Sequence, residues 1–192
     1  MTFEEEDRLL GALPERATVV VQLGLECGAR IQSELLGLRW PDVDLDRQQL
    51  HITAVHSKNG KGRVLPLSDG MTATLRTMQA TATSDLVFPG RGGRFYHRFK
   101  ADYFAALHKA KLAGLGIGVH TCRHSWASRM IEAGADLVTL RDLGGWSDLS
   151  LVSRYSHFRP QRGADATAAM LALRDTARRP ALAVVGSTST SR

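Results

Sequence analysis

The chain of 192 residues is 43% hydrophobic and 23% charged, a composition typical of a globular protein with a core of its own. Its formal charge of +6 favours a polyanionic partner, first of all nucleic acid, with a ribosome or a membrane surface as alternatives. It has no apolar run of about 18 residues, and its two cysteines lie far apart. These features exclude a membrane span and a disulfide-stabilised miniprotein.

Two helices are predicted at the amino terminus. Thr2 and Glu5 have the spacing of a capping box, so a helix over residues 3–13 should begin there. An apolar segment over residues 17–27 predicts a second helix, which should end at the glycine that follows. The first helix carries acids where a secretory signal would carry positive charge, and we therefore expect a cytoplasmic protein.

A small antiparallel sheet is predicted between residues 43 and 67, where the apolar residues change to a period of two. The run Lys-Asn-Gly-Lys-Gly at residues 58–62 separates two of the strand-like segments. An Asn-Gly pair can take the positive φ angles of a tight turn, so this run should form the tip of a hairpin that carries lysines. A short helix over residues 33–38 should precede the sheet.

Helical periodicity returns after the sheet and dominates the rest of the chain. The predicted helices cover residues 69–79, 95–112, 121–133, 137–143, 149–156 and 161–179. Residues 180–192 are rich in serine and threonine and should fray. The expected fold class is therefore α+β, mainly α-helical, with one small antiparallel sheet.

Several separated segments carry residues suited to phosphate chemistry. Arg30 follows a glycine turn before a helix, where a guanidinium and backbone N–H groups can face one oxyanion. His120 and Arg123 lie three residues apart at another helix start, so they project to nearly the same side. Trp146 follows a Leu-Gly-Gly run, and Tyr155 lies nine residues further on.

Taken together and in this order, these segments resemble the catalytic domain of the tyrosine recombinases, which include the phage and transposon integrases. The match spans roughly residues 2–158 and rests on five motifs. They are Gly-Ala-Arg with the following Glu-Leu-Leu-Gly-Leu, a hairpin lysine, His-Thr-Cys-Arg, Leu-Gly-Gly-Trp and the final tyrosine. Cys27 and Cys122 depart from the residues usual at their positions, but neither touches the chemistry that the resemblance implies.

The resemblance implies a site that cleaves and rejoins DNA strands without a metal or any other cofactor. The implied catalytic residues are Arg30, Lys58, His120, Arg123, Trp146 and Tyr155, with Glu34 in a supporting role. In this assignment Tyr155 is the nucleophile of a 3′-phosphotyrosine intermediate, and the two arginines hold the scissile phosphate. The lysine is the general acid, and Lys61 is the alternative at the same hairpin.

The remaining two side chains have roles that follow from their chemistry. His120 can accept or orient the proton of the tyrosine. Trp146 cannot accept a proton, because an indole N–H only donates, and its role is a hydrogen bond to a phosphate oxygen together with packing. Taken singly, each of the chosen residues is more often structural, and His124 and His157 read as ordinary core or surface histidines.

The resemblance also implies the domain organisation and the partners. Residues 1–160 should form the catalytic domain and residues 161–192 a carboxyl-terminal helix with a flexible tail, while the family's amino-terminal DNA-clamp domain is absent from this chain. The implied partner is double-stranded DNA, bound by a homo-oligomer, a tetramer, with accessory DNA-bending proteins and no membrane contact. The protein should then be nucleoid-associated within the cytoplasm.

Two other functions remain open from the sequence. A type IB topoisomerase shares the chemistry of a tyrosine nucleophile but relaxes supercoils without pairing two sites. A catalytically silent DNA-binding module would keep the basic surface and lose one or more of the site residues.

Overall fold

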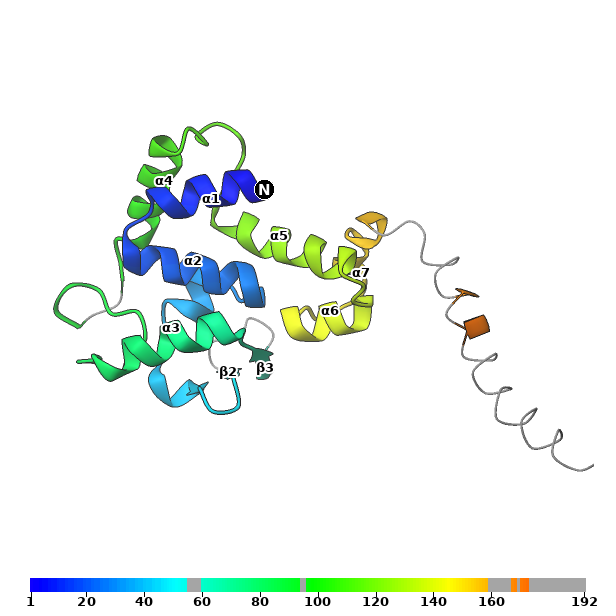
Figure 1. Cartoon of the computed structure of the whole chain (residues 1–192), viewed down its shortest axis with the longest axis horizontal. Coiled ribbons are helices and arrows are strands. Elements are labelled where there is room, and N and C mark those ends of the chain that lie inside the picture. Colours follow the sequence, from blue (N-terminus) through cyan, green and yellow to red (C-terminus); the bar gives the residue numbers. More distant parts are fainter. Residues whose placement is uncertain (55–59, 94–95, 159–166, 169, 173–192) are drawn as a thin grey trace, which may run out of the picture. The chain divides into compact units, whose positions relative to one another are not determined.

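The computed structural model describes residues 1–54, 60–93, 96–158, 167–168 and 170–172. The chain divides into two units, Met1–Ser156 and His157–Arg192, and every element that positions the site belongs to the first unit (Figure 1). Most of the predicted helix over residues 161–179 lies outside the described residues, although the few that are described there are helical. All of the predicted tail, residues 180–192, also lies outside them.

The described part of the chain is mainly helical, with one small sheet. Its α-helices are α1 (Phe3–Ala12), α2 (Glu15–Cys27), α3 (Asp69–Ala80), α4 (Phe99–Lys109), α5 (Val119–Glu132), α6 (Leu137–Gly144) and α7 (Ser150–Ser153). Shorter helical turns are η1 (Ile31–Leu35), η2 (Trp40–Asp42), η3 (Arg91–Gly93) and η4 (Ser156–Phe158). The strands are β1 (Val43–Asp44), β2 (Gln49–Ile52) and β3 (Arg63–Pro66). This architecture confirms the predicted fold class.

The amino-terminal helix begins with the predicted capping box. The hydroxyl of Thr2 accepts a hydrogen bond from the backbone N–H of Glu5 (3.1 Å), and the Glu5 carboxylate accepts one from the N–H of Thr2 (2.7 Å). The helix packs on α2 and α4, and an ion pair from Glu6 to Arg129 joins it to α5 (2.5 Å). Two of the orphan N–H groups at the helix start are thus satisfied by side chains.

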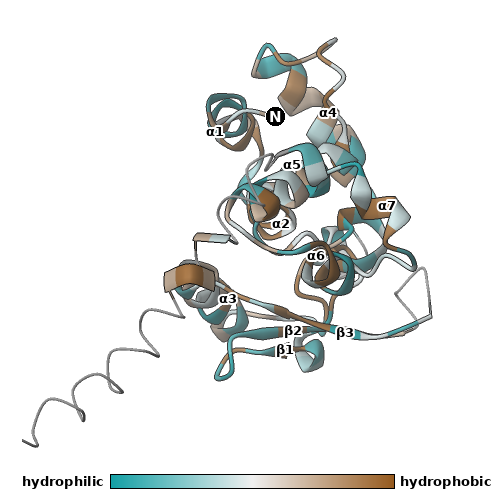
Figure 2. Ribbon diagram, turned by 90° about the vertical axis from the view of Figure 1, so that its right-hand side faces the viewer, coloured by the Kyte–Doolittle hydropathy of each residue, from teal (hydrophilic) through white to brown (hydrophobic). Residues whose placement is uncertain are grey.

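The centre of the first unit is the packing of α2 against α5 (Figures 1 and 2). Most residues of α2 are buried, in line with its apolar sequence. The helix ends at Gly28, which has a φ of +68°, a conformation that side chains with a Cβ rarely adopt. A Cβ there would also collide with the ring of Trp126 on α5. Gly28 therefore allows the chain to turn sharply beside α5 and leads directly to Arg30.

The sheet is antiparallel with the strand order β1-β2-β3. Leu50 at its centre pairs with Val43 on one side and Leu65 on the other, and these three side chains are buried. Arg63 is the first residue of β3, opposite Ile52. The strand also contacts α6, so the hairpin delivers Arg63 to the end of that helix.

A second hydrophobic cluster lies between α5, α6 and α7. Its buried members are Trp126, Ala127, Ile131, Leu140, Val152 and Tyr155, and Trp146 packs against them. The two tryptophan rings are stacked with their centroids 6.3 Å apart. The chain after α6 is therefore fixed to α5 by aromatic packing.

Three predicted elements differ from the structure. The segment expected to form a helix over residues 33–38 is instead a π-helical turn that begins at Ile31. The helix expected over 149–156 is only the single turn of α7, which ends at Ser153, where the hydroxyl donates to the carbonyl of Ser150 (2.7 Å). The helix expected from residue 95 begins at Phe99.

In the parts of the chain that the structure describes, every helix is too short or too polar to cross a bilayer.

Candidate active site

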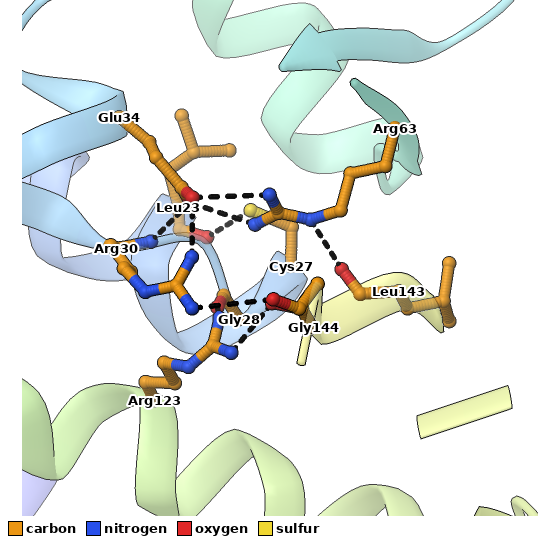
Figure 3. Close-up of polar contacts among 10 residues, drawn as sticks. Leu23, Cys27, Gly28, Arg30, Glu34, Arg63, Arg123, Leu143 and Gly144 are labelled. Carbon is orange, nitrogen blue, oxygen red and sulfur yellow. Dashed lines mark hydrogen bonds and ion pairs between the residues drawn. The ribbon is translucent and has the colours of Figure 1, made fainter. Parts of the chain in front are cut away.

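A buried carboxylate lies at the centre of the candidate site (Figure 3). Glu34 is 1% exposed, and its two oxygens accept four hydrogen bonds. Arg30 donates to it from Nη1 (2.8 Å) and from its backbone N–H (2.7 Å), and Arg63 donates from Nη1 (3.0 Å) and Nη2 (2.7 Å). Burial acts to raise the pKa of Glu34, but these arginines outweigh it and hold the pKa below its ordinary value.

The π-helical turn explains how Glu34 reaches back to Arg30. The N–H of Leu35 donates to the carbonyl of Arg30 (3.2 Å), and the N–H of Leu36 donates to that of Ile31 (2.9 Å), each five residues back. This wider turn follows directly after the Gly28 bend. Arg30 and Glu34 are thereby held as a pair by local backbone geometry and by two hydrogen bonds.

Three arginines from distant segments meet at the carboxyl end of α6. Arg63 Nε donates to the carbonyl of Leu143 (2.7 Å), while Arg123 Nη2 and Arg30 Nη2 donate to the next two carbonyls, at residues 144 (2.5 Å) and 145 (3.3 Å). Figure 3 shows the first two of these contacts beside Glu34. The last carbonyls of a helix lack intrahelical partners and carry partial negative charge, so this helix end attracts the guanidinium groups.

The Gly-Gly pair makes this arrangement possible. Gly145 caps α6 with a φ of +65°, and a Cβ there would lie 2.9 Å from Nη1 of Arg63. A side chain at Gly144 would overlap the ring of Trp146. The two glycines therefore leave room for the arginines on one side and for the indole on the other.

Arg123 is more deeply buried than Arg30. The residue is 7% exposed, and its Nη1 donates to the carbonyl of Gly28 (2.6 Å). Its guanidinium carbon lies 3.8 Å from the ring centroid of Trp146, a cation–π contact. Burial and the neighbouring charge of Arg30 lower the pKa of Arg123 to about 9, so the group stays charged at neutral pH.

The phenol of Tyr155 lies on the other side of the site. The residue is 4% exposed, its ring is 6.0 Å from that of Trp146, and its hydroxyl lies 2.5 Å from Nδ1 of His124. Burial raises the pKa of Tyr155, and the positive charges of Arg154 and Arg123 act in the opposite direction. Because Trp146 contacts both the Arg123 guanidinium and the phenol ring, the indole joins the two halves of the site.

A cleft of about 460 Å³ opens beside the arginines. Its lining includes Lys61 from the hairpin, Arg63, Arg141 and Trp146. A larger cleft of about 500 Å³ lies near Trp40, between α2 and α3, and contains none of the site residues. The smaller cleft adjoins the buried arginines, and its lining carries three cationic side chains against one carboxylate, that of Asp142.

The structure brings together most of the residues that the sequence selected. Arg30, Glu34, Arg123, Trp146 and Tyr155 form one connected cluster. His120 is exposed on the first turn of α5, one turn before His124. Lys58 lies outside the described residues.

Two residues of the cluster, Arg63 and His124, were not among the site residues predicted from the sequence. Arg63 begins a strand, where a charged residue is expected to face solvent. Its position directly after the glycine that ends the predicted hairpin tip was the available signal. His124 follows Arg123 and lies four residues after His120, so its helical spacing could have placed it on the same face. Among the described residues no group of three or more His, Cys, Asp or Glu side chains is placed to hold a metal ion.

Solved structures of recombinases and integrases share this fold. The structure matches the catalytic domain of bacteriophage HP1 integrase with a TM-score of 0.67 and 22% identity, over 87% of this chain and 92% of that one. It matches XerA recombinase with a TM-score of 0.69 and 17% identity, over 88% of this chain and 62% of that one.

The chain belongs to the phage integrase family, whose model matches residues 1–162. It is 33% identical over 146 residues to the tyrosine recombinase XerC of Xanthomonas campestris pv. campestris, a match that covers 74% of this chain and 44% of XerC. It is 27% identical over 166 residues to the integrase of Salmonella phage P22, covering 81% of this chain and 43% of that protein. The chain therefore spans less than half the length of these relatives.

Proposed function

We propose that this chain is the catalytic domain of a site-specific DNA recombinase, with Tyr155 as the nucleophile of a 3′-phosphotyrosine intermediate. The observation that carries the proposal is the convergence of Arg30, Arg123 and Tyr155 on one place from three distant segments. Trp146 contacts both the guanidinium of Arg123 and the phenol ring. Side chains with only structural roles have no reason to meet in this order and in this combination.

The arginines account for the binding of the scissile phosphate. Arg123 donates to the carbonyls of Gly28 and Gly144, and Arg30 donates to Glu34 and to a carbonyl of the α6 end. These bonds fix the plane of each guanidinium, and its remaining N–H groups can donate to phosphate oxygens. A phosphoryl group in transfer spreads negative charge over its non-bridging oxygens. Donors already oriented toward that charge stabilise the transition state by roughly 3–4 kcal/mol each.

The covalent step conserves a phosphodiester linkage. The Oη of Tyr155 forms a bond to phosphorus as it loses its proton, and the bond from phosphorus to the 5′ oxygen breaks. The 5′ oxygen must then take a proton, and we assign this general acid role to Lys58, with Lys61 as the alternative. Trp146 completes the site by donating its indole N–H to a phosphate oxygen and by packing.

The proposed partner is double-stranded DNA, recombined by a homotetramer, with residues 1–160 as the catalytic domain. Support comes from solved structures that share this fold, among them XerH bound to its difH substrate and a λ integrase dimer bound to a core site. The formal charge of +6 and the cationic cleft beside Trp146 suit a polyanion. The carboxyl-terminal segment, residues 161–192, would then join neighbouring subunits.

Tyr155→Phe should abolish covalent attachment to DNA, because the ring stays in place while the attacking oxygen is lost. The measurement uses nicked duplexes with a randomised central segment, which trap a covalent adduct that denaturing gels detect and sequencing identifies. Tyr96→Phe is the matched control, since the hydroxyl of Tyr96 donates to Asp102 away from the site (2.6 Å). An adduct of equal yield with Tyr155→Phe, or none with the unmodified protein, contradicts the proposed function.

The general acid can be identified by changing the leaving group. Lys58→Ala should slow cleavage of an ordinary duplex by about 100-fold or more, and a duplex with sulfur at the 5′ bridging position should restore the rate, because a thiolate leaves without a proton. Lys61→Ala should weaken DNA binding without showing this rescue, since Lys61 lines the cleft. Rescue of Lys61→Ala and not of Lys58→Ala would reverse the assignment.

A further inference from the structure

The hydroxyl of Tyr155 has a defined partner that the sequence did not select. Nδ1 of His124 lies 2.5 Å from it, and the two ring centroids are 6.0 Å apart. The tyrosine follows α7, whereas the histidine is on α5, so the contact joins two elements across the second hydrophobic cluster. Of the two histidines on this face of α5, the structure places His124, not His120, against the phenol.

The two members of this pair differ in their exposure to solvent. Tyr155 is buried, and its hydroxyl contacts His124, which is itself exposed to solvent. A phenol that donates to Nδ1 requires a neutral imidazole with its proton on Nε2. Once Nδ1 has accepted a proton, the exposed histidine can release its other proton, from Nε2, to water. The buried phenol itself has little contact with solvent.

We propose that His124 is a catalytic residue, the general base that takes the proton of Tyr155 as the phenol oxygen attacks phosphorus. This inference rests on the proposed function. The step balances within the site: the Oη–H bond breaks, its proton binds Nδ1, and the freed electron pair forms the bond to phosphorus. The 5′ oxygen receives a different proton, from the general acid.

The charges around His124 favour its neutral form. The titratable or charged groups that face it are His120 and Arg123 on its own helix, and Arg154 and Tyr155 after α7. Partial burial, followed by the charges of Arg154, His120 and Arg123, lowers the pKa of His124 below its ordinary value of 6.5. The imidazole is thus ready to accept a proton at neutral pH.

Two substitutions separate proton transfer from positioning. His124→Asn keeps a hydrogen-bonding atom near the Nδ1 position but cannot accept a proton near neutral pH, and His124→Leu can do neither. We expect both variants to form adduct about 100-fold more slowly than the unmodified protein, with unchanged melting temperatures. His108→Asn, on the exposed face of α4, is the matched control and should keep the full rate.

Two further readouts test the direction of the proton. In the unmodified protein the adduct rate should rise with pH through a pKa below 6.5, and His124→Asn should lack this rise. A duplex with sulfur at the 5′ bridging position should leave His124→Asn slow, because the substitution affects the attacking oxygen and not the leaving group.

The possible outcomes separate a failure of this inference from a failure of the proposed function. If His124→Asn cleaves at the full rate, or is rescued by the sulfur duplex, His124 is not the base, although a Tyr155-dependent adduct still supports the recombinase. If only His124→Leu is slow, the histidine only positions the phenol, and the inference is overturned. If the unmodified protein forms no adduct on any duplex, both proposals fail together.

Discussion

Arg123→Lys should lower the rate of covalent adduct formation by about 10²–10³-fold. The guanidinium of Arg123 lies over the ring of Trp146 and donates to the carbonyls of Gly28 and Gly144, so its remaining N–H groups have a fixed direction. A lysine ammonium is a single charged point on a flexible chain and cannot satisfy both carbonyls and a phosphate in one geometry. The loss should therefore appear in the chemical step, even at saturating DNA.

The measurement is a single-turnover rate of adduct formation on the duplex recovered from the randomised pool. Arg76→Lys is the matched control, because Arg76 is exposed on α3 and pairs with Asp46 away from the site (3.2 Å). Thermal unfolding of both variants shows whether the protein remains folded. Equal rates for the Arg123 and Arg76 variants would mean that the buried guanidinium does not contact the transferred phosphate.

The site residues were selected from the sequence through the ordered motifs of the tyrosine recombinases, and Glu34 was named only because the resemblance implies an acidic residue there. The spacing of Arg30 and Glu34, four residues apart beside a glycine turn, is local, and the structure shows the two side chains in contact. The position of Tyr155 in the motif order was equally visible. Its environment was not, because the phenol packs in a cluster formed with residues of α5 and α6 that lie far away in the sequence.

The contacts that join distant segments could not be predicted from the sequence. Arg63 reads as one polar residue of an alternating strand, and only the tertiary packing of β3 on α6 shows that it shares Glu34 with Arg30. The Gly-Gly pair before Trp146 predicts the end of a helix. It does not predict that three successive carbonyls at that end each accept a hydrogen bond from a different arginine.

This helix end also explains how three positive side chains can be packed together. Arg30, Arg63 and Arg123 repel one another, and each loses hydration as it is buried. The Glu34 carboxylate and the partial negative charge of the α6 carbonyls offset that cost. The same arrangement leaves the cluster with a net positive charge, which is what a phosphate-binding site requires.

Glu34→Gln should destabilise the folded protein by about 3–5 kcal/mol near neutral pH, the usual cost of removing one partner from a buried ion pair. Glutamine keeps the shape of the side chain and one carbonyl acceptor, but it leaves Arg30 and Arg63 without a compensating charge. The free energy of unfolding, measured with a chemical denaturant, gives the difference. Glu132→Gln makes the same charge change at the exposed end of α5 and should have little effect.

The difference between the unmodified protein and Glu34→Gln should depend on pH. The arginines hold the pKa of Glu34 in the folded state below the ordinary value of 4.5, so the unfolded chain binds this proton more readily than the folded one. The stabilisation by Glu34 is therefore complete above the ordinary carboxyl pKa, and it is lost as the pH falls through the lower pKa of the folded state. Denaturation curves at decreasing pH should show the two proteins converging. A difference that stays constant down to the acid-unfolding range would show that Glu34 acts through its shape and not through its charge.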